Sequence, residues 1–544
     1  MPMPRPVVRL LPFFALWMLV TVLLSLSLDA RSAEQDSALA HVSTLLVKNF
    51  DDKAKAVALL VDANHPRTEE ILRLIQDGAL YYRKNDDRLF SIASSEQGAE
   101  AIDLLDASVV TIEKTRDFKK VTLNNLMRGQ IGLALAEIGL KSGDPRRREA
   151  AVRKLLGELS DESVAVLRKR IGAEPVSAVR ELILVALALN DLKNGDEAAR
   201  LQAVTQVEGS LEPPVRSALT LVAESDASPV VKQKAQLALN GIDEQVRWYG
   251  MVETLYFGIS LGSVLVLAGI GLAITFGVMG VINMAHGELI MLGAYTTYVI
   301  QQLMPNYLGA SILVAIPAAF MVSALVGVAI ERGVIRFLYG RPLETLLATF
   351  GISLVLQQAV RSVFSPLNRS VSTPEWMSGM VEINPVLSLT LSRLYIIIFC
   401  LLVFVALVLV LKRTPLGLQV RAVSQNRAMA RAMGVRSKWV DAMTFGLGSG
   451  VAGVAGVALS QLTNVGPNLG QAYIIDSFMV VVFGGVGNLW GTLVAGLSLG
   501  IANKVLEPWA GAVLAKILVL VFIILFIQKR PRGLFPQRGR AAEG

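Results

Sequence analysis

The chain has 544 residues, of which 53% are apolar and only 18% are charged, and its mean hydropathy is +0.52. Soluble globular proteins average about 25% charged residues, so this composition excludes a wholly soluble protein. A single cysteine, Cys400, excludes an internal disulfide, and three histidines argue against a metal site, so we expect no cofactor. Cys400 lies in the apolar run Ile396–Val410 and is predicted to be inert and to face lipid.

Charge is divided unequally along the chain. Residues 31–245 carry 29 Lys/Arg and 33 Asp/Glu, a net charge of −4, whereas residues 246–544 carry 21 and 10, a net charge of +11. A basic surplus in membrane loops sets the orientation of a membrane protein. The isoelectric point of the chain, about 9.5, is therefore set by a membrane domain and does not indicate nucleic-acid binding.

Residues 1–30 have the pattern of a secretory signal peptide. Arg5 and Arg9 precede the apolar stretch Leu10–Leu28, and Ala30 is a small residue at a plausible cleavage point. The alternative is an uncleaved first membrane helix. Both interpretations place the following residues outside the cytoplasm.

Residues 31–245 are predicted to form an all-helical periplasmic domain. Apolar residues recur at helical spacing, as in Val179, Leu182, Ile183 and Ala186. Prolines open successive helical stretches of similar type at irregular spacing, which resembles a HEAT-like stack of helix pairs. Such a stack offers an extended surface, so we expect a binding or scaffolding role and no catalysis.

Residues 246–535 are predicted to be an all-α polytopic membrane bundle of about eight or nine spans. A span needs about 20 mostly apolar residues. Two of the candidates, 284–303 and 473–487, are weak, and each could be a broken or re-entrant helix. The candidates are residues 253–277, 284–303, 309–331, 343–363, 392–411, 439–461, 473–487, 490–506 and 511–528.

The loops between these spans predict the orientation. The loops 331–344, 412–438 and 529–544 carry fifteen Lys/Arg, whereas the loops on the other side carry only Arg369. The positive-inside rule places the fifteen in the cytoplasm. We therefore expect a multi-pass inner-membrane protein with a periplasmic N-terminal domain and a cytoplasmic tail, residues 536–544.

The largest cytoplasmic loop, 412–438, is predicted to hold two short helices. Asn426 is a candidate N-cap of the second helix, and Gly434 is suited to a left-handed residue after it. One side of the loop is predicted to be apolar through Val423, Met429, Ala430 and Met433. From the residues alone, docking into a groove on a cytoplasmic partner and resting on anionic lipid are both open.

Polar residues interrupt the membrane segments at two glycine-rich places. Residues 276–288 include Asn283, His286 and Glu288, and residues 483–491 form a second break. Ionisable residues inside a membrane indicate a functional site, and paired breaks in two halves suggest a translocation path. The alternative is that Asn283 and His286 only cap a broken helix. The further candidates for the path are Gln357, Asn464 and Asp476.

No Walker A sequence occurs in the chain, so the chain itself is predicted not to hydrolyse ATP. Several motifs, in order over residues 250–535, resemble the permease subunits of ABC importers of the branched-chain amino acid type. These motifs are INMAHGELIMLGAY, RPLETLLATFGISLVLQQ, TPLGLQVRAVSQNRAMARAMGV and IIDSFMVVVFGGVGNLWGT.

The resemblance implies a non-enzymatic subunit that works with a second, related permease, two ATPase subunits and a periplasmic binding protein. It also implies that the loop around residues 414–436 contacts the ATPases, which favours docking over lipid. The candidate coupling residues are Gly417, Arg421, Asn426, Arg427, Arg431 and Gly434.

Within that family, the motif wording and the long secreted extension resemble the permease of a urea importer, so urea is the expected substrate. A branched-chain or other amino acid importer is the nearest alternative. A channel or secondary transporter that needs no ATPase, and a membrane-anchored scaffold whose soluble half carries the function, are alternatives of other classes.

Overall fold

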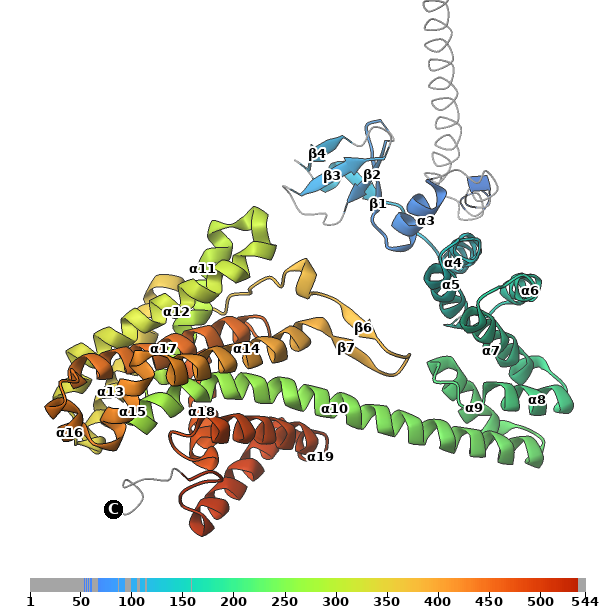
Figure 1. Ribbon diagram of the computed structural model, residues 1–544. Coiled ribbons are helices and arrows are strands. Elements are labelled where there is room, and N and C mark those ends of the chain that lie inside the picture. Colours follow the sequence, from blue (N-terminus) through green and yellow to red (C-terminus); the bar gives the residue numbers. More distant parts are fainter. Residues whose placement is uncertain are drawn as a thin grey trace, which may run out of the picture. The chain divides into compact units, whose positions relative to one another are not determined.

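The computed structural model describes residues 67–536, apart from gaps at 87, 93–98, 105–107, 113–114 and 158, together with isolated positions between 53 and 60. The predicted signal peptide, residues 1–30, lies outside the described residues, as does the tail after residue 536. The chain forms two compact units, one ending at Asp243 and the other beginning at Glu244 (Figure 1).

The first elements described in full are α3 (Thr68–Gln76) and a five-stranded antiparallel sheet of order β4-β3-β2-β1-β5. In its register, Tyr81 lies opposite Phe90. Leu80 and Leu89 pack in one cluster with residues of α3 and of the helix that follows the sheet. The strands are β1 (Leu80–Arg83), β2 (Leu89–Ile92), β3 (Glu100–Asp103), β4 (Val109–Thr111) and β5 (Phe118–Lys120), with the short 3-10 helix η2 (Thr115–Asp117) before β5.

This sheet shows that the prediction of an all-helical, HEAT-like domain is wrong. Each strand has only three or four residues. Runs this short do not carry the alternation of apolar and polar residues over four to eight positions that indicates a strand. Helices flank the sheet on both sides in sequence and supply most of the periodic signal.

The rest of the first unit is helical. Asn124 caps α4 by accepting a hydrogen bond from the Met127 N–H, and Ser160 and Ser163 form a capping box at α6. The helices are α4 (Asn125–Leu140), α5 (Pro145–Gly157), α6 (Asp161–Ile171), α7 (Ser177–Asn194), α8 (Glu197–Val207), α9 (Pro213–Ser225) and the beginning of α10 (Pro229–Met279).

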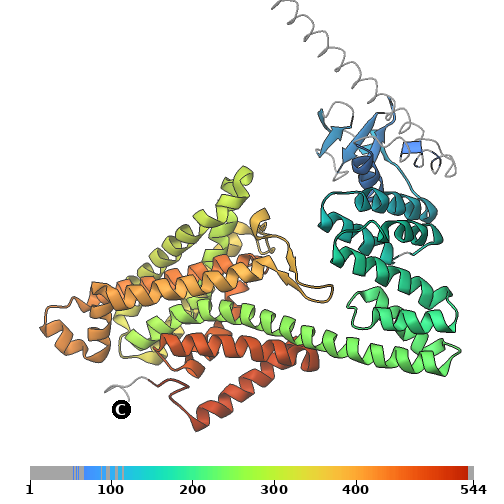
Figure 2. The same cartoon turned by 45° about the vertical axis from the view of Figure 1, so that its right-hand side comes forward.

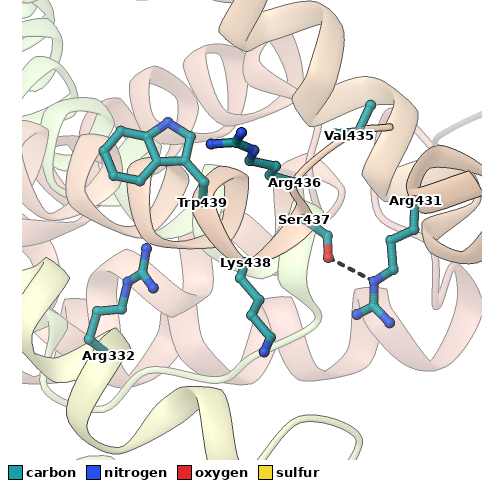
Figure 3. Close-up of a pocket in the computed structure, with 7 residues that line it drawn as sticks. All are labelled: Arg332, Arg431, Val435, Arg436, Ser437, Lys438 and Trp439. Atoms are coloured by element: carbon teal, nitrogen blue, oxygen red, sulfur yellow. Dashed lines mark hydrogen bonds between the residues drawn. The ribbon is translucent and has the colours of Figure 1, made fainter. Parts of the chain in front are cut away.

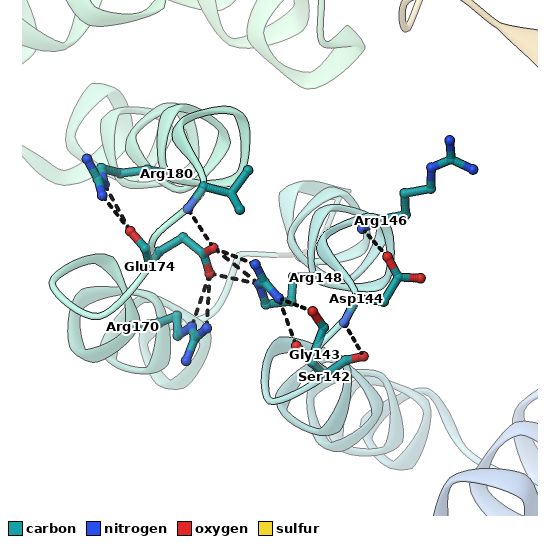
Figure 4. Close-up of polar contacts among 9 residues, drawn as sticks. Ser142, Gly143, Asp144, Arg146, Arg148, Arg170, Glu174 and Arg180 are labelled. Carbon is teal, nitrogen blue, oxygen red and sulfur yellow. Dashed lines mark hydrogen bonds and ion pairs between the residues drawn. The ribbon is translucent and has the colours of Figure 1, made fainter.

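Two ion pairs, one buried and one partly buried, reveal a repeat within these helices. Arg148 pairs with Glu174 at 2.9 Å, and its guanidinium also donates to the backbone carbonyl of Gly143 (Figure 4). Arg200 pairs with Asp226 at 2.8 Å and donates to the carbonyl of Gly195. Each residue of the second set lies 52 positions after its counterpart, so α5–α7 and the stretch from α8 into α10 are two copies of one three-helix repeat.

Glu174 joins several segments of the first copy. Its carboxylate accepts hydrogen bonds from Arg148 and Arg170 and from the Val176 N–H (Figure 4). Burial alone would raise the pKa of Glu174, but these donors outweigh burial and hold the pKa below its usual value. The carboxylate is therefore charged at neutral pH and ties three segments together.

The second unit is a bundle of apolar helices. Its elements are the remainder of α10, α11 (His286–Leu303), η3 (Pro305–Tyr307), α12 (Leu308–Gly333), η4 (Ile335–Phe337), α13 (Pro342–Phe364), η5 (Glu375–Met377), α14 (Leu391–Arg413), α15 (Pro415–Gln425), α16 (Arg427–Ala432), α17 (Ser437–Ser460), α18 (Leu469–Gly484) and α19 (Leu489–Lys529). A hairpin of β6 (Met380–Glu382) and β7 (Ser388–Thr390) precedes α14.

Six helices among the described residues are long and apolar enough to cross a membrane, whereas nine were predicted. All nine predicted stretches are helical over most of their length. The difference arises because α18 has 16 residues, α11 carries His286, Glu288 and two glutamines, and α19 joins two predicted spans across a kink at Gly511.

The core of the bundle is the packing of α17 against α11 and α12 (Figures 1 and 2). Glycines allow this close approach. A Cβ atom on Gly293 of α11 would lie 2.0 Å from the carbonyl oxygen of Gly453 on α17, and one on Gly456 would lie 2.0 Å from that of Ile290. Small residues at such crossings let membrane helices pack backbone to backbone.

Cys400 is buried, which corrects the prediction that it faces lipid. It belongs to the inward stripe of α14 with Ile396, Phe404 and Leu407, and its exposed fraction is 1%. Almost every position of α14 is apolar, so hydropathy alone could not tell its inner face from its outer face.

Candidate translocation path and coupling loop

The helical structure is interrupted between α10 and α11, at the first glycine-rich stretch. Gly280 has a φ of 65°, which ends α10 in the left-handed region that glycine adopts without strain. Asn283 then accepts a hydrogen bond from the Ala285 N–H at 3.0 Å, and His286 bonds the carbonyl of Ala268 at 2.8 Å. Both residues therefore satisfy the backbone of a broken helix.

These residues also keep unused hydrogen-bonding capacity. Asn283 and His286 are completely buried and Glu288 is 1% exposed. Asn283 Nδ2, His286 Nδ1 and Glu288 Oε2 have no hydrogen-bond partner among the residues that the structure describes. Buried polar atoms without a protein partner cost free energy and indicate a water or ligand site.

A polar stripe on α13 faces this break. Thr345, Thr349, Ser353 and Gln357 recur every four residues and are all buried. Thr349 accepts a hydrogen bond from the Met284 N–H at 3.1 Å, and Ser353 donates to Glu288 Oε1 at 3.1 Å. The stripe therefore connects α13 to the break at two successive turns.

The stripe continues toward the segment between α17 and α18. Gln357 donates to the carbonyl of Pro467 at 3.2 Å and to Asn468 Oδ1 at 3.0 Å. One turn further, Arg361 donates to the same Asn468 oxygen at 2.8 Å. We call Thr345, Thr349, Ser353, Gln357 and Arg361 the α13 stripe.

The opposite side of α13 is mostly apolar. Large exposed side chains cover it, as expected for a helix that turns its polar residues toward the protein in a membrane. These side chains are Leu343, Leu347, Phe350, Leu354, Val355 and Val363.

Two residues predicted for the path lie apart from the stripe. Asp476 on α18 pairs with Lys516 of α19 at 3.3 Å, and Asn464 is exposed in the segment between α17 and α18. Of the other predicted path residues, Gln357 belongs to the stripe, and Asn283 and Glu288 lie at the break that the stripe faces. His286 lies against α10.

The second glycine-rich break, between α18 and α19, lies against the first. Gly485 and Gly487 have φ of 103° and 79°. A Cβ atom on Gly277 would lie 2.3 Å from the Cα of Gly487, so the two breaks are in backbone contact.

The loop between α14 and α17 has the two short helices predicted for it. Thr414 caps α15, and Asn426 caps α16 by accepting a hydrogen bond from the Met429 N–H at 2.9 Å. Gly434 has a φ of 87°, which confirms the predicted left-handed residue. Gly417 is required because a Cβ atom there would lie 2.0 Å from the carbonyl oxygen of Leu411.

Three arginines fasten this loop to the membrane helices. Arg427 donates to both carboxylate oxygens of Asp441 on α17, at 2.7 and 2.9 Å, and Asp441 is 1% exposed. Arg431 donates to Ser437 Oγ at 2.8 Å, and Arg421 donates to the carbonyl of Leu411. The candidate coupling residues therefore make contacts within the chain that hold α15 and α16 in place.

The predicted apolar side of the loop is divided between two surfaces, which corrects the expectation of one. Val423 and Ala430 are buried in a cluster with Val420 and Val440. Met429 and Met433 are 60% and 79% exposed. Leu418 is also exposed, so the outer surface still has apolar side chains.

Sequence reasoning named Gln357 but missed Thr349, Ser353, Arg361 and Asn468. A signal was available, since polar residues at every fourth position through an apolar segment predict a polar stripe on one helix face. Asn468 had no such signal, because its role follows from how α13 meets a loop about a hundred residues further along the chain.

Comparison with known proteins identifies the family of the chain. The family described as branched-chain amino acid transport system, permease component, matches residues 254–527. The high-affinity branched-chain amino acid transport system permease protein LivH of Escherichia coli K12 is 30% identical over 294 residues, which are 52% of this chain and 94% of the relative. The corresponding protein BraD of Pseudomonas aeruginosa is 29% identical over 295 residues, 53% of this chain and 96% of the relative.

A more distant similarity is to the ribose import permease protein RbsC of Bacillus subtilis, 32% identical over 110 residues, 19% of this chain and 34% of the relative. No solved structure matches. The membrane bundle is that of a transport permease. The chain belongs to the branched-chain amino acid transport permease family and is a multi-pass, non-enzymatic membrane subunit.

Proposed function

We propose that this chain is the permease subunit of an ATP-driven importer and that its substrate passes along the α13 stripe. The observation that carries the proposal is the row of hydrogen bonds from Thr349 to Arg361, which joins the break between α10 and α11 to the segment between α17 and α18. Next to it, Glu288 and Asn283 keep buried polar atoms with no partner in the described structure. A small polar substrate would supply the missing partners.

Energy would come from other subunits. The chain contains no Walker A sequence, and its loop 412–438 holds two short helices clamped onto α17. We propose that two ATPase subunits dock on the exposed surface that includes Leu418, Met429 and Met433. Movement of the loop would reach the bundle through Arg427 and Asp441. A second permease subunit and a periplasmic binding protein would complete the importer.

For the substrate, an amino acid is the better supported candidate. LivH and BraD, which align over nearly the whole membrane bundle, are both named for branched-chain amino acids, and neither is named for urea. Glu288 and Arg361 at two levels of the stripe suit the two charges of a zwitterion. The expected urea specificity has no support from these relatives.

Urea stays a second candidate because of one observation. These relatives align to little more than half of the chain, although they are covered almost completely. They therefore say nothing of the first unit, which together with the wording of the motifs carried the likeness to a urea importer.

The test is ATP-dependent uptake by the complete complex in proteoliposomes. We expect labelled leucine to be accumulated and to be displaced by excess unlabelled valine but not by urea. Accumulation of labelled urea that leucine does not reduce would reverse the choice of substrate. Uptake that continues without the ATPase subunits would refute the importer itself and favour a channel or secondary transporter.

A further inference from the structure

We propose that a basic cavity at the ends of α12 and α17 binds the phosphate headgroup of an anionic membrane lipid. The cavity has a volume of about 760 Å³. Four of the residues that line it are cationic, and none of them is acidic (Figure 3). The lining residues are Arg332, Arg431, Val435, Arg436, Ser437, Lys438 and Trp439.

The four cations come from three elements. Arg332 approaches from the last turn of α12 and Arg431 from α16, while Arg436 and Lys438 flank the first residue of α17 (Figure 3). The side chains of Arg436 and Lys438 make no hydrogen bond or ion pair with any residue in the described part of the chain, and both residues are exposed. Their charges are therefore available to a ligand.

The cations that do have partners are only partly neutralised. Arg431 donates to the neutral hydroxyl of Ser437. Arg332 lies 3.6 Å from Glu331, whose side chain is 2% exposed while that of Arg332 is 38% exposed. The cavity thus presents a surplus of positive charge, which fits a phosphodiester anion.

The surroundings of the cavity favour a lipid over a soluble anion. Trp439 is 55% exposed at the beginning of a membrane-length helix, where tryptophan commonly marks the membrane–water interface. One turn further along α17, Met443 is also exposed, and on α12 the exposed Leu325 lies two turns before Arg332. Apolar surface therefore leads away from the cations on both helices, and an acyl chain could follow it.

The charge bias of the loops assigns this end of α12 and α17 to the cytoplasmic side. Basic pockets between membrane helices on that side are a known type of site for anionic headgroups. The cavity is separate from the α13 stripe, so the lipid would support the junction between the coupling loop and the bundle and would not enter the path.

The experiment uses the intact complex in nanodiscs of phosphatidylcholine that contain a small fraction of phosphatidylglycerol. Retention of phosphatidylglycerol is measured by native mass spectrometry for the wild type, for R436Q/K438Q, and for K529Q/R530Q. The last variant removes two cations at the end of α19, outside the cavity. Inorganic phosphate is added in a parallel series as the soluble source of the same anion.

We expect R436Q/K438Q to weaken phosphatidylglycerol binding about 30-fold, since each cation near a membrane surface contributes about 1 kcal/mol, and K529Q/R530Q to change it little. Inorganic phosphate should not displace the lipid. Equal retention by all three proteins would overturn the proposal. Full displacement by phosphate would identify a soluble-anion site instead. Loss of the ATPase subunits from R436Q/K438Q with lipid retained would show that the cavity is a protein docking site.

Discussion

Replacing Gln357 by leucine tests whether the α13 stripe is part of the transport machinery. The Gln357 amide donates to the carbonyl of Pro467 and to Asn468, and leucine fills a similar volume without a donor. A hydrogen bond contributes about 1 kcal/mol net, so the contact between α13 and the segment before α18 should weaken by about 2 kcal/mol. That corresponds to about a 30-fold shift in any equilibrium that depends on the contact.

The assay is initial uptake rate by the reconstituted complex, normalised to the amount of folded protein. Gln358 provides a matched control, because it has the same side chain, follows in sequence and is exposed on the outer side of α13. We expect Q357L to lose at least nine-tenths of the uptake rate and Q358L to keep most of it. Equal uptake by Q357L and the wild type, or equal loss in both variants, would refute the assignment.

Three further tests probe the close helix crossing in the bundle, the Arg427–Asp441 ion pair of the loop and the Glu174 carboxylate of the first unit. G453A should lower the melting temperature of the purified protein, because overpacking costs about 1–3 kcal/mol. G351A on α13, where nothing lies within 4 Å of the new Cβ, should not lower it. Equal melting temperatures of G453A and the wild type would contradict the close crossing. R427Q should lower the free energy of unfolding by about 3 kcal/mol and raise the amount of ATP hydrolysed per substrate imported. Adding D441N to the same chain should restore part of the stability. If the losses from the two substitutions were additive, the ion pair would not be supported. E174Q should destabilise the first unit at pH 7 by about 3 kcal/mol. The pKa of Glu174 is lowered in the folded chain, so its contribution to stability is complete above the unfolded pKa and is lost as the pH falls through the folded pKa. The melting temperature of E174Q should therefore depend less on pH below about 4 than that of the wild type. Parallel plots of melting temperature against pH would contradict this.

Local features of the structure could be predicted from neighbouring residues. The cap at Asn426, the left-handed Gly434 and the breaks at 276–288 and 483–491 each follow from the conformational preferences of a few consecutive residues. Predictions of this kind need no knowledge of what the segment packs against.

Features that depend on distant partners could not be predicted. From the sequence, Arg427 is expected to be a surface cation of a basic loop. In the structure it is paired with Asp441, because α16 folds back on α17. The 52-residue repeat was hidden for a different reason. The prolines are irregularly spaced, and the repeat is carried by an arginine and an acidic residue that meet only after folding.

The most direct test of the account is the accessibility of position 353 to water during transport. Cys400, the only cysteine of the chain, is first replaced by alanine, and cysteine is then introduced at Ser353 on the stripe or at the exposed Leu354 beside it. The complex is treated with a charged, membrane-impermeant thiol reagent with and without ATP. If the stripe lines the path, S353C reacts, its rate depends on ATP and transported substrate slows it, while L354C in lipid does not react. An S353C that stays unreactive in every state, in a complex that still imports its substrate, would contradict the account.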